Sequence, residues 1–476
     1  MARINTNVAS LTAQRGLART QKTLSETLQR LSTGLRINRG ADDPAGLIAS
    51  EGLRSEISGI NQAIDNSQRA SNVISTTEGA LNEVANLLLN IKSLVVEAAN
   101  RGALSPEEIA ANQLQIDSAI ESITRISNTT TFAGLKLLDG SLDYITSGIS
   151  GSAITALQIN QANFGNNDTI PVEVQVITSA QQAELQFRGS AIASSVVLEI
   201  SGKEGTDTLQ FLSGTAVSGI LAAINRVGHQ LGLQASYINS ANPASGIALR
   251  SEGYGTQNFV SVRAQSGTFN TVDASGNART RTVGVDAVAT INGALTVGSG
   301  LDIKLNTASL DMELTLDASF GAGSTSFVIT GGGALFQLGP RVSTNQQINI
   351  GIQSVAASKL GDDVTGFLTD MQTGGTATLV GNNAEQAGKI IEKAIRQVAV
   401  LRGRLGAFER NTLDTNMNSL SIALENVTAS ESSIRDADFA AETAALTRAQ
   451  ILTQAGTSVL ATANATPQSV LTLLQG

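Results

Sequence analysis

Apolar residues repeat with a helical period at the two ends of the chain and with a strand period in the middle. Residues 1–130 and 383–474 place leucine, isoleucine and valine three and four positions apart, which predicts long amphipathic helices of the coiled-coil type. Residues from about 140 to 375 alternate apolar and polar positions among many glycines, which predicts short strands and turns. The chain is therefore predicted to be a discontinuous, multi-domain α+β protein. Its paired helical ends and a helical bundle carry an inserted, mostly-β outer region.

The N-terminal helices are separated by a break that contains glycine. Gly34 and Gly40 interrupt the first apolar stripe. Asp42-Asp43-Pro44 then predicts a new helix, because a carboxylate caps the first turn and proline is tolerated at the first helical position. This helix keeps its apolar rhythm to Asn100, so it is too long to be stable without partner helices. The first stripe consists of Ile4, Val8, Leu11, Leu17, Leu24, Leu28, Leu31 and Leu35.

The third helix has a strong start signal. Ser105-Pro106-Glu107-Glu108 predicts a capping box, with Ser105 as the cap and Glu108 as its partner. The apolar face expected for this helix is Leu114, Ile116, Ile120, Ile123 and Ile126.

Helix returns at Asn383 in the C-terminal part of the chain. Its apolar seam runs to Phe408 and continues after a phase shift to Val427. A polar break at 428–433 is expected to separate a final helix that begins near Ile434. That helix is rich in alanine, and small side chains allow close packing.

Two-residue alternation predicts the strands of the middle region. Val172, Val174 and Val176 alternate with polar residues. The segment 216–227 is predicted to be a short helix, and 265–281, rich in Ser, Thr, Asn and Gly, is predicted to be a linker or long loop. Further strands are expected at 196–200, 209–212, 232–238, 246–250, 258–263, 301–305, 312–316 and 346–355.

These signals predict three structural parts. Residues 1–43 and 431–476 form a terminal helical domain, and residues 44–178 and 360–430 form a helical bundle with a β-hairpin. Residues 179–359 form the inserted outer region, which is divided into two modules at about 190–270 and 280–355.

Composition excludes several classes of function. The 476 residues include no cysteine, which excludes disulfides and thiolate metal sites. His229 is the single histidine, so no two-histidine metal site can form. A net charge of −9 without a basic block disfavours nucleic-acid binding. We expect no secretory signal peptide and no membrane span, because no apolar stretch approaches the ~18 residues that a span requires.

The candidate chemical sites have simpler structural interpretations. His229 is expected on the surface, because the partners that catalysis would need are missing. Gly321-Ala322-Gly323 and the triple glycine 331–333 are interpreted as turns rather than phosphate loops. Asp42-Asp43 and Glu107-Glu108 are interpreted as helix caps. No catalytic, cofactor-binding or metal-binding residue is predicted.

The apolar seams allow two interpretations. Residues 44–130 and 383–427 are expected to form a core within one molecule. The outer pieces, 1–35 and 434–474, are narrowly striped and set apart by breaks, so we expect them to pair mainly between subunits. The residues predicted for this pairing are Ile4, Val8, Leu11, Leu24, Leu28, Leu31, Leu35, Ile434, Ile451, Leu452, Val459, Leu460 and Leu471.

The two ends resemble bacterial flagellin. The N-terminal similarity lies in INTNVASLTAQRGL (4–17), LQRLSTGLRINRGADDPAGLIASEGLRSEI (28–57) and NQAIDNSQRASNVISTTEGALNEV (61–84). The C-terminal similarity runs from SIRDADFAAETAAL to SVLTLL (433–474). The runs at 214–236 and 246–262 resemble an inserted flagellin module of strands around one helix.

The resemblance implies the self-assembling subunit of the extracellular flagellar filament, a motility propeller. It implies an inner tube of paired terminal helices, a surrounding shell formed by the helices behind Pro44 and Asn383, and an outward-facing middle region. The implied partners are other copies of the chain, an export chaperone, the flagellar export apparatus, and filament cap and junction proteins. No cofactor, nucleic acid or membrane is implied. Export through the flagellar apparatus would account for the missing signal peptide.

The resemblance also concerns an innate-receptor contact stretch, which is altered here. In this chain the stretch reads Leu89, Asn90, Ile91, Lys92, Ser93 and Leu94. Many flagellins that the receptor detects carry arginine and glutamate where Asn90 and Ser93 stand. The resemblance therefore implies weak receptor activation.

Two other functions remain open at this point. A hook–filament junction protein shares the TG-RI…DDPAG stretch, although the C-terminal run favours flagellin. A secreted enzyme or adhesive filament protein could use the helical ends as a scaffold. The absence of a nucleophile–base set argues against an enzyme, whereas the abundance of Ser and Thr leaves an adhesive or glycan-bearing middle region open.

Overall fold

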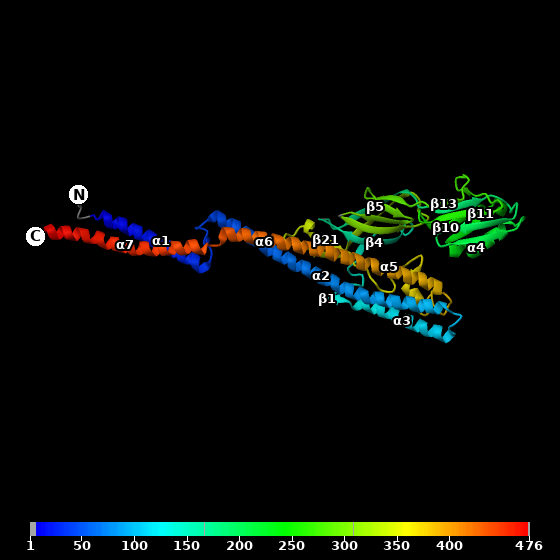
Figure 1. Ribbon diagram of the computed structural model, residues 1–476, viewed down its shortest axis with the longest axis horizontal. Coiled ribbons are helices and arrows are strands. Elements are labelled where there is room, and N and C mark those ends of the chain that lie inside the picture. Colours follow the sequence, from blue (N-terminus) through cyan, green and yellow to red (C-terminus); the bar gives the residue numbers. More distant parts are fainter. Residues whose placement is uncertain (1–5, 166, 308, 475–476) are drawn as a thin grey trace. The chain divides into compact units, whose positions relative to one another are not determined.

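The computed structural model describes residues 6–165, 167–307 and 309–474, with side chains described up to Thr466 in the last helix. Figure 1 shows helices at both ends of the chain and strands in its middle, as the apolar pattern predicts. The described residues form two compact units. The first comprises residues 6–69, 337–342 and 410–474, and the second comprises residues 70–336 and 343–409.

Helices make up most of the first unit. α1 (Val8–Thr33) ends at Gly34, whose φ of 72° is the left-handed conformation that glycine adopts without strain. α2 (Pro44–Ala99) begins where predicted, and Asp43 Oδ1 accepts a hydrogen bond from Gly46 N at 2.9 Å. The first part of α2 packs against α6 (Thr415–Arg435) around Ile60 and Leu420. The last helix is α7 (Phe439–Leu474).

The predicted break before the last helix was wrong. α6 continues through 428–433 to Arg435, so Ile434 belongs to α6 rather than to the final helix. Hydroxyl side chains remain compatible with a helix when they bond the backbone one turn earlier, as Ser430 Oγ does with Asn426 O at 2.7 Å. The actual break lies at 436–438, where Asp438 Oδ1 accepts the first N–H groups of α7.

The second unit contains a helical bundle formed by the later part of α2, α3 (Pro106–Thr129) and α5 (Ala384–Phe408). The capping box is confirmed: Ser105 Oγ accepts from Glu108 N at 3.2 Å, and Glu108 Oε2 accepts from Ser105 N at 2.7 Å. The expectation for Leu114 was wrong, because this side chain is exposed. The buried residues of the bundle include Ile74, Leu81, Leu88, Ile91, Ile109, Ile116, Ile120, Ile123, Ile391, Val398 and Leu405.

A π-helical turn explains the phase shift in the C-terminal seam. The turn, η4 (Glu409–Asp414), joins α5 directly to α6. Because a π turn holds more residues than an α turn, the apolar positions resume five residues later, from Phe408 to the buried Leu413.

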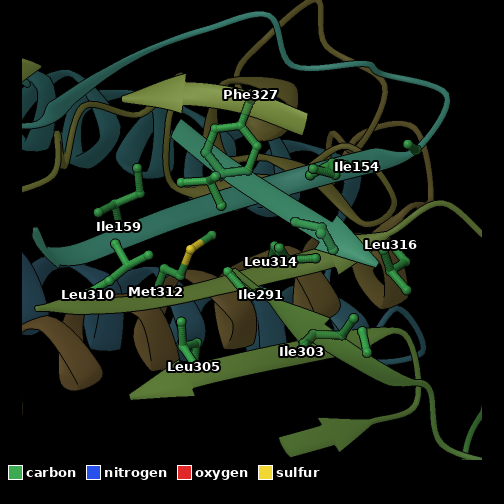
Figure 2. Close-up of a cluster of buried hydrophobic side chains, with 14 of the residues drawn as sticks. Ile154, Ile159, Ile291, Ile303, Leu305, Leu310, Met312, Leu314, Leu316 and Phe327 are labelled. Carbon is green, nitrogen blue, oxygen red and sulfur yellow. The ribbon is translucent and has the colours of Figure 1, made fainter. Parts of the chain in front are cut away.

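One β module combines strands from residues 144–178 and 288–350. Its sheets have the strand orders β15-β14-β5-β19-β3 and β16-β17-β18-β4-β21-β20. Figure 2 shows side chains of both sheets, among them Phe327, Ile291 and Met312, meeting in one core. The strand pairing therefore crosses the predicted boundary between residues 178 and 179. The strands are β3 (Tyr144–Ser147), β4 (Ile154–Ala162), β5 (Ile170–Thr178), β14 (Val288–Ile291), β15 (Ala294–Leu295), β16 (Val297–Ser299), β17 (Asp302–Asn306), β18 (Leu310–Leu316), β19 (Gly323–Gly332), β20 (Ala334–Gln337) and β21 (Gln347–Ile350).

A second β module consists of residues 182–283. Its sheets have the strand orders β12-β6-β10-β9 and β13-β11-β7-β8, and α4 (Val217–Leu231) packs on them through Ile220 and Ile224. The strands are β6 (Gln182–Phe187), β7 (Val196–Ser201), β8 (Thr206–Phe211), β9 (Leu233–Tyr237), β10 (Ile247–Tyr254), β11 (Phe259–Ser266), β12 (Val272–Asp273) and β13 (Arg281–Val283). Two short hairpins elsewhere in the unit are β1 (Thr131–Phe132) with β2 (Leu135–Lys136), and β22 (Gly361–Asp362) with β23 (Gly366–Phe367).

Two expectations for this module were wrong. α4 extends beyond the predicted end, so His229 lies in its last turn rather than after the helix. The segment 265–281 is not a linker, because β12 pairs with β6 and Asp273 accepts hydrogen bonds from Asn277 N and Ser275 N across a tight turn.

Candidate functional site

The two terminal helices pack side by side in opposite directions. Near the start of α1, Asn7 Nδ2 donates to Ala463 O at 2.7 Å, and Ser10 Oγ donates to Asn464 Oδ1 at 2.7 Å. Near the end of α1, Arg30 Nη1 lies 3.1 Å from Glu442 Oε1. Figure 1 shows this pair as the blue and red helices whose ends carry the labels N and C.

The breaks that precede α2 and α7 are joined to each other. Leu35 and Asp436 form an antiparallel bridge. Arg36 N donates to Arg435 O at 2.7 Å, and Ala437 N donates to Gly34 O at 2.9 Å. The two breaks therefore form one hydrogen-bonded joint, although 400 positions separate Leu35 from Arg435 in the sequence.

Two carboxylates order this joint. Asp42 Oδ2 accepts from Arg39 N at 2.8 Å and from Asn38 N at 3.0 Å, and these backbone donors hold the pKa of Asp42 below its ordinary value. Glu51 Oε1 lies 3.0 Å from both Arg54 Nη1 and Arg435 Nη1. The hydrogen bond from Arg54, with the charges of both arginines, lowers the pKa of Glu51.

α1 and α7 contact each other along one side of the pair, largely through small and hydroxyl side chains. Ser10, Thr27 and Ala449 are buried there. A Cβ atom placed on Gly456 would lie 3.3 Å from Leu17 Cδ1, so α7 approaches α1 closely at this glycine. Of the residues predicted for pairing, Leu24, Leu31 and Leu460 are half-buried.

A second apolar set on the same helices remains exposed, and we call it the exposed terminal face. Its side chains range in exposure from 46% for Leu11 to 62% for Val8. Exposed apolar side chains that gather into one patch often mark an interaction site. The exposed terminal face consists of Val8, Leu11, Leu28, Ile451, Leu452 and Val459.

The structure separates the other predicted pairing residues. Leu35 lies in the joint between the breaks, and Ile434 lies in the last turn of α6. Ile4 lies outside the described residues, as does the side chain of Leu471.

Several residues that organise the helix pair were missed in the sequence analysis. Asn7 directly precedes α1 and accepts a hydrogen bond from Ser10 N at 3.0 Å, so its position is an N-cap signal. Asp438 has the same signal before α7. The contacts of Ser10 and Arg30 have no local signal, because their partners lie more than 400 residues away.

The altered receptor stretch lies in the bundle part of α2. Ile91 is buried in the core, whereas Leu89, Asn90 and Ser93 are exposed. Lys92 Nζ lies 3.1 Å from Glu392 Oε1 on α5. The two substituted positions therefore face solvent in the described chain.

The remaining candidate sites have structural roles. His229 is 80% exposed, and its Nδ1 lies 2.9 Å from Glu252 Oε1. The glycines 331–333 have positive φ values; the first two end β19, and the third lies between β19 and β20. Among the described residues, no group of three or more histidine, aspartate or glutamate side chains is placed to hold a metal ion. Within the same residues, no helix combines the length and apolar character required to cross a membrane.

Comparison with known proteins identifies similarity at both ends and along the whole chain. The bacterial flagellin N-terminal helical region matches residues 4–143, and the bacterial flagellin C-terminal helical region matches residues 389–474. A B-type flagellin of Pseudomonas aeruginosa is 31% identical, with 99% of each chain covered. A flagellin of Salmonella typhimurium is 30% identical, also with 99% of each chain covered.

Solved structures with similarity include FliC of Burkholderia pseudomallei, at 15% identity and a TM-score of 0.22. That match covers 72% of this chain and 99% of the other. The D2-D3 domains of the flagellar cap protein FliD from Escherichia coli match at 21% identity and a TM-score of 0.29, covering 40% of this chain and 99% of theirs.

Terminal helices that pack against each other, at the two ends of a sequence with a β-rich middle region, thus occur together with full-length similarity to flagellins. The chain belongs to the bacterial flagellin family and is a structural subunit of the flagellar filament.

Proposed function

We propose that the subunit polymerises through the exposed terminal face of α1 and α7. The observation that supports this proposal is the division of one apolar stripe into two sets. Leu24 and Leu31 are half-buried against α7, whereas Leu11 and Leu28 of the same helix remain exposed. A helix pair with an apolar face left in solvent gains stability when a second pair covers that face.

The expected contribution of each residue follows from apolar burial. Complete burial of a leucine or valine side chain contributes about 1.5–3 kcal/mol. Leu11 and Leu28 are about half exposed, so each would contribute about 1 kcal/mol on assembly. Because about 1.4 kcal/mol corresponds to a tenfold change in an equilibrium constant, the two together have a measurable effect on polymerisation.

The test is the critical concentration for polymerisation of purified subunits. We expect the double variant Leu11→Ser/Leu28→Ser to raise this concentration by about tenfold or more. The control, Leu212→Ser/Leu295→Ser, replaces two leucines of the β modules that are 68% and 70% exposed and should leave the concentration within about twofold of the original. Equal effects of the two variants would contradict the proposal.

The three-part division serves as a proposal for the filament. Residues 1–43 and 431–476 would form the inner tube, and residues 44–178 and 360–430 would form the surrounding bundle. Residues 179–359 would form the outer region, and β4 and β5 of the preceding part pair with its strands β18 and β14. The similarity to flagellins supports this division, as does the joint between Gly34 and Ala437. The proposed role is structural, without enzymatic activity or a cofactor.

The proposed partners are other copies of the chain, a flagellin export chaperone, the flagellar export apparatus, and filament cap and junction proteins. Export by the flagellar apparatus would bring the subunit outside the cell without a cleaved signal peptide. We expect secretion of the subunit to be lost in a strain that lacks the flagellar export apparatus. Secretion should continue when the general secretory route is blocked. The reverse pattern would contradict it.

Weak activation of the innate receptor for flagellin is also proposed. Asn90 and Ser93 are exposed on α2 and lack the charges that receptor-detected flagellins present there. In a receptor reporter assay, purified monomer should give a weak response, and the double variant Asn90→Arg/Ser93→Glu should give a stronger one. A strong response to the unaltered monomer would contradict this proposal.

A further inference from the structure

The chain crosses between its two β modules twice, and the crossing segments pair with each other. The first segment follows β5 and the second precedes β14. Gln181 N donates to Val285 O at 2.8 Å, and Val285 N donates to Gln181 O at 2.9 Å. A turn of the second module joins them, because Gly255 N donates to Gln181 O at 3.1 Å. The junction is therefore hydrogen-bonded along its length, unlike a flexible linker.

Asp286 lies in the second crossing segment, and its carboxylate bonds to a turn from each module. Oδ1 accepts from Thr256 N at 3.0 Å and Oδ2 accepts from Thr256 Oγ1 at 2.5 Å, in the turn between β10 and β11. Oδ1 also accepts from Gly300 N at 2.7 Å, in the turn between β16 and β17. One side chain thus bonds residues on both sides of the junction.

The charge of Asp286 strengthens these bonds. Burial raises the pKa of the carboxyl group, but the donors on Thr256 and Gly300 outweigh burial and leave the pKa below its ordinary value. Asp286 is therefore ionised at neutral pH, and hydrogen bonds to an ionised acceptor are stronger than bonds between neutral groups.

Glycines keep the junction closely packed. A Cβ atom on Gly255 would lie 2.2 Å from Asp286 Oδ1 and 2.6 Å from Gly300 Cα. A Cβ atom on Gly284 would lie 2.5 Å from both Gln181 O and Gly255 O. The backbones of both modules approach so closely that no side chain fits between them, which limits rotation about the crossing segments.

We propose that Asp286 is a positioning residue that fixes the module of residues 182–283 in one orientation on the module of strands β3–β5 and β14–β21. The outer part of the subunit would then be displayed as one rigid body. This inference is independent of the proposed polymerisation through α1 and α7, because it concerns contacts within one chain.

The test measures the distance between two spin labels in the full-length monomeric chain. The sequence contains no cysteine, so Gln210→Cys on β8 and Ser324→Cys on β19 provide two unique label sites on exposed residues. Double electron–electron resonance spectroscopy then gives the distribution of distances between the two spin labels, and hence between the modules. Three further substitutions are compared in this background: Asp286→Ala, Thr256→Val and Asp317→Ala.

Asp317 is the matched control. Its Oδ1 accepts hydrogen bonds from Ser319 within a loop of a single module, so its loss should not change the junction. We expect a single narrow distribution in the unsubstituted chain and in Asp317→Ala. Asp286→Ala should broaden it about twofold or more, because three bonds to a charged acceptor are lost. Thr256→Val removes only the hydroxyl donor and should broaden it less.

A broad distribution in the unsubstituted chain would overturn the proposed rigid junction. Equal widths in all chains would overturn the role of Asp286, and equal broadening in Asp317→Ala would overturn its specificity. Hydrogen exchange in β7 and β18 distinguishes a freed junction from unfolding: protection in both strands should be unchanged. If Asp286→Ala unfolds a module, Thr256→Val remains the deciding variant.

Discussion

The terminal helix pair and the helical bundle begin with similar sequence patterns but use them differently. Both carry apolar residues three and four positions apart. In the bundle, α2, α3 and α5 bury most of their apolar seams, and Leu88 and Ile120 have no exposed surface. In the terminal pair, α1 and α7 bury mainly small and hydroxyl side chains and leave Leu28 and Val459 in solvent. Seam periodicity therefore predicts that a helix needs a partner, but it does not tell whether that partner lies in the same molecule.

The largest expected difference concerns the stability of the monomer. Ile120→Ala should lower the free energy of unfolding by about 2–5 kcal/mol, because it leaves a cavity in a fully buried seam. Leu28→Ala should change it by about 0.5 kcal/mol or less, because the residue is half exposed. Denaturant unfolding of each monomer measures both effects. A cost for Leu28→Ala as large as that for Ile120→Ala would show that the exposed terminal face is already covered in the monomer.

Removal of a helix cap should show a smaller difference in stability between the bundle and the terminal helix pair. Ser105→Ala removes the cap of α3 inside the bundle and should cost about 1 kcal/mol of global stability. Asn7→Ala removes the cap of α1 and the bond to Ala463 O, but terminal helices fray independently of the core. Its effect should therefore appear as faster hydrogen exchange in the first turn of α1, with an unchanged global transition. A loss of global stability for Asn7→Ala would mean that the two regions unfold together.

The ion pair between α1 and α7 should contribute less to stability than the helix caps do. Arg30 and Glu442 lie 3.1 Å apart, with side-chain exposures of 35% and 14%. A double-mutant cycle with Arg30→Gln and Glu442→Gln should give a coupling of about 0.2–1 kcal/mol for local opening of the pair. The control cycle at Lys22 and Glu26, an exposed pair at 3.7 Å, should give less. A larger coupling at the control pair would contradict the assignment of Arg30 to the helix contact.

The smallest effect concerns pH and the α3 cap. Hydrogen bonds from Ser105 lower the pKa of Glu108 below 4.5. Since a lowered acid pKa stabilises the fold only while the group is ionised, this contribution is present at neutral pH and is lost as the pH falls through the folded-state value. The stability difference between the unsubstituted chain and Glu108→Gln should therefore shrink on acidification below 4.5. A difference that grows on acidification would contradict the capping box.

Local signals predicted those parts of the fold that depend on nearby residues. The caps at Asp43 and Ser105 were predicted because the deciding contacts lie within one helical turn, and α5 begins directly after the predicted Asn383. The alternation in β5 was predicted for the same reason: Val172, Val174 and Val176 are all buried.

The errors concern features that distant contacts decide. The polar stretch 428–433 stays helical, and α7 begins at Phe439, two residues beyond the contact of Ala437 N with Gly34 O. β12 joins its sheet by pairing with β6, almost 90 residues earlier in the chain. Leu114 is exposed although leucine is usually buried, because α3 turns the face with Ile109 and Ile116 toward the core. The buried Ser10 and Thr27 could not be found from apolar spacing, because neither residue is apolar.

Removal of the terminal helices tests the central comparison most directly. Two shortened chains, one without residues 1–35 and one without residues 439–476, are compared with the full chain in thermal unfolding and in seeded polymerisation. We expect both to keep the cooperative unfolding transition of the bundle and to form no filaments. Normal filaments from either shortened chain, or loss of the bundle transition in both, would contradict the account.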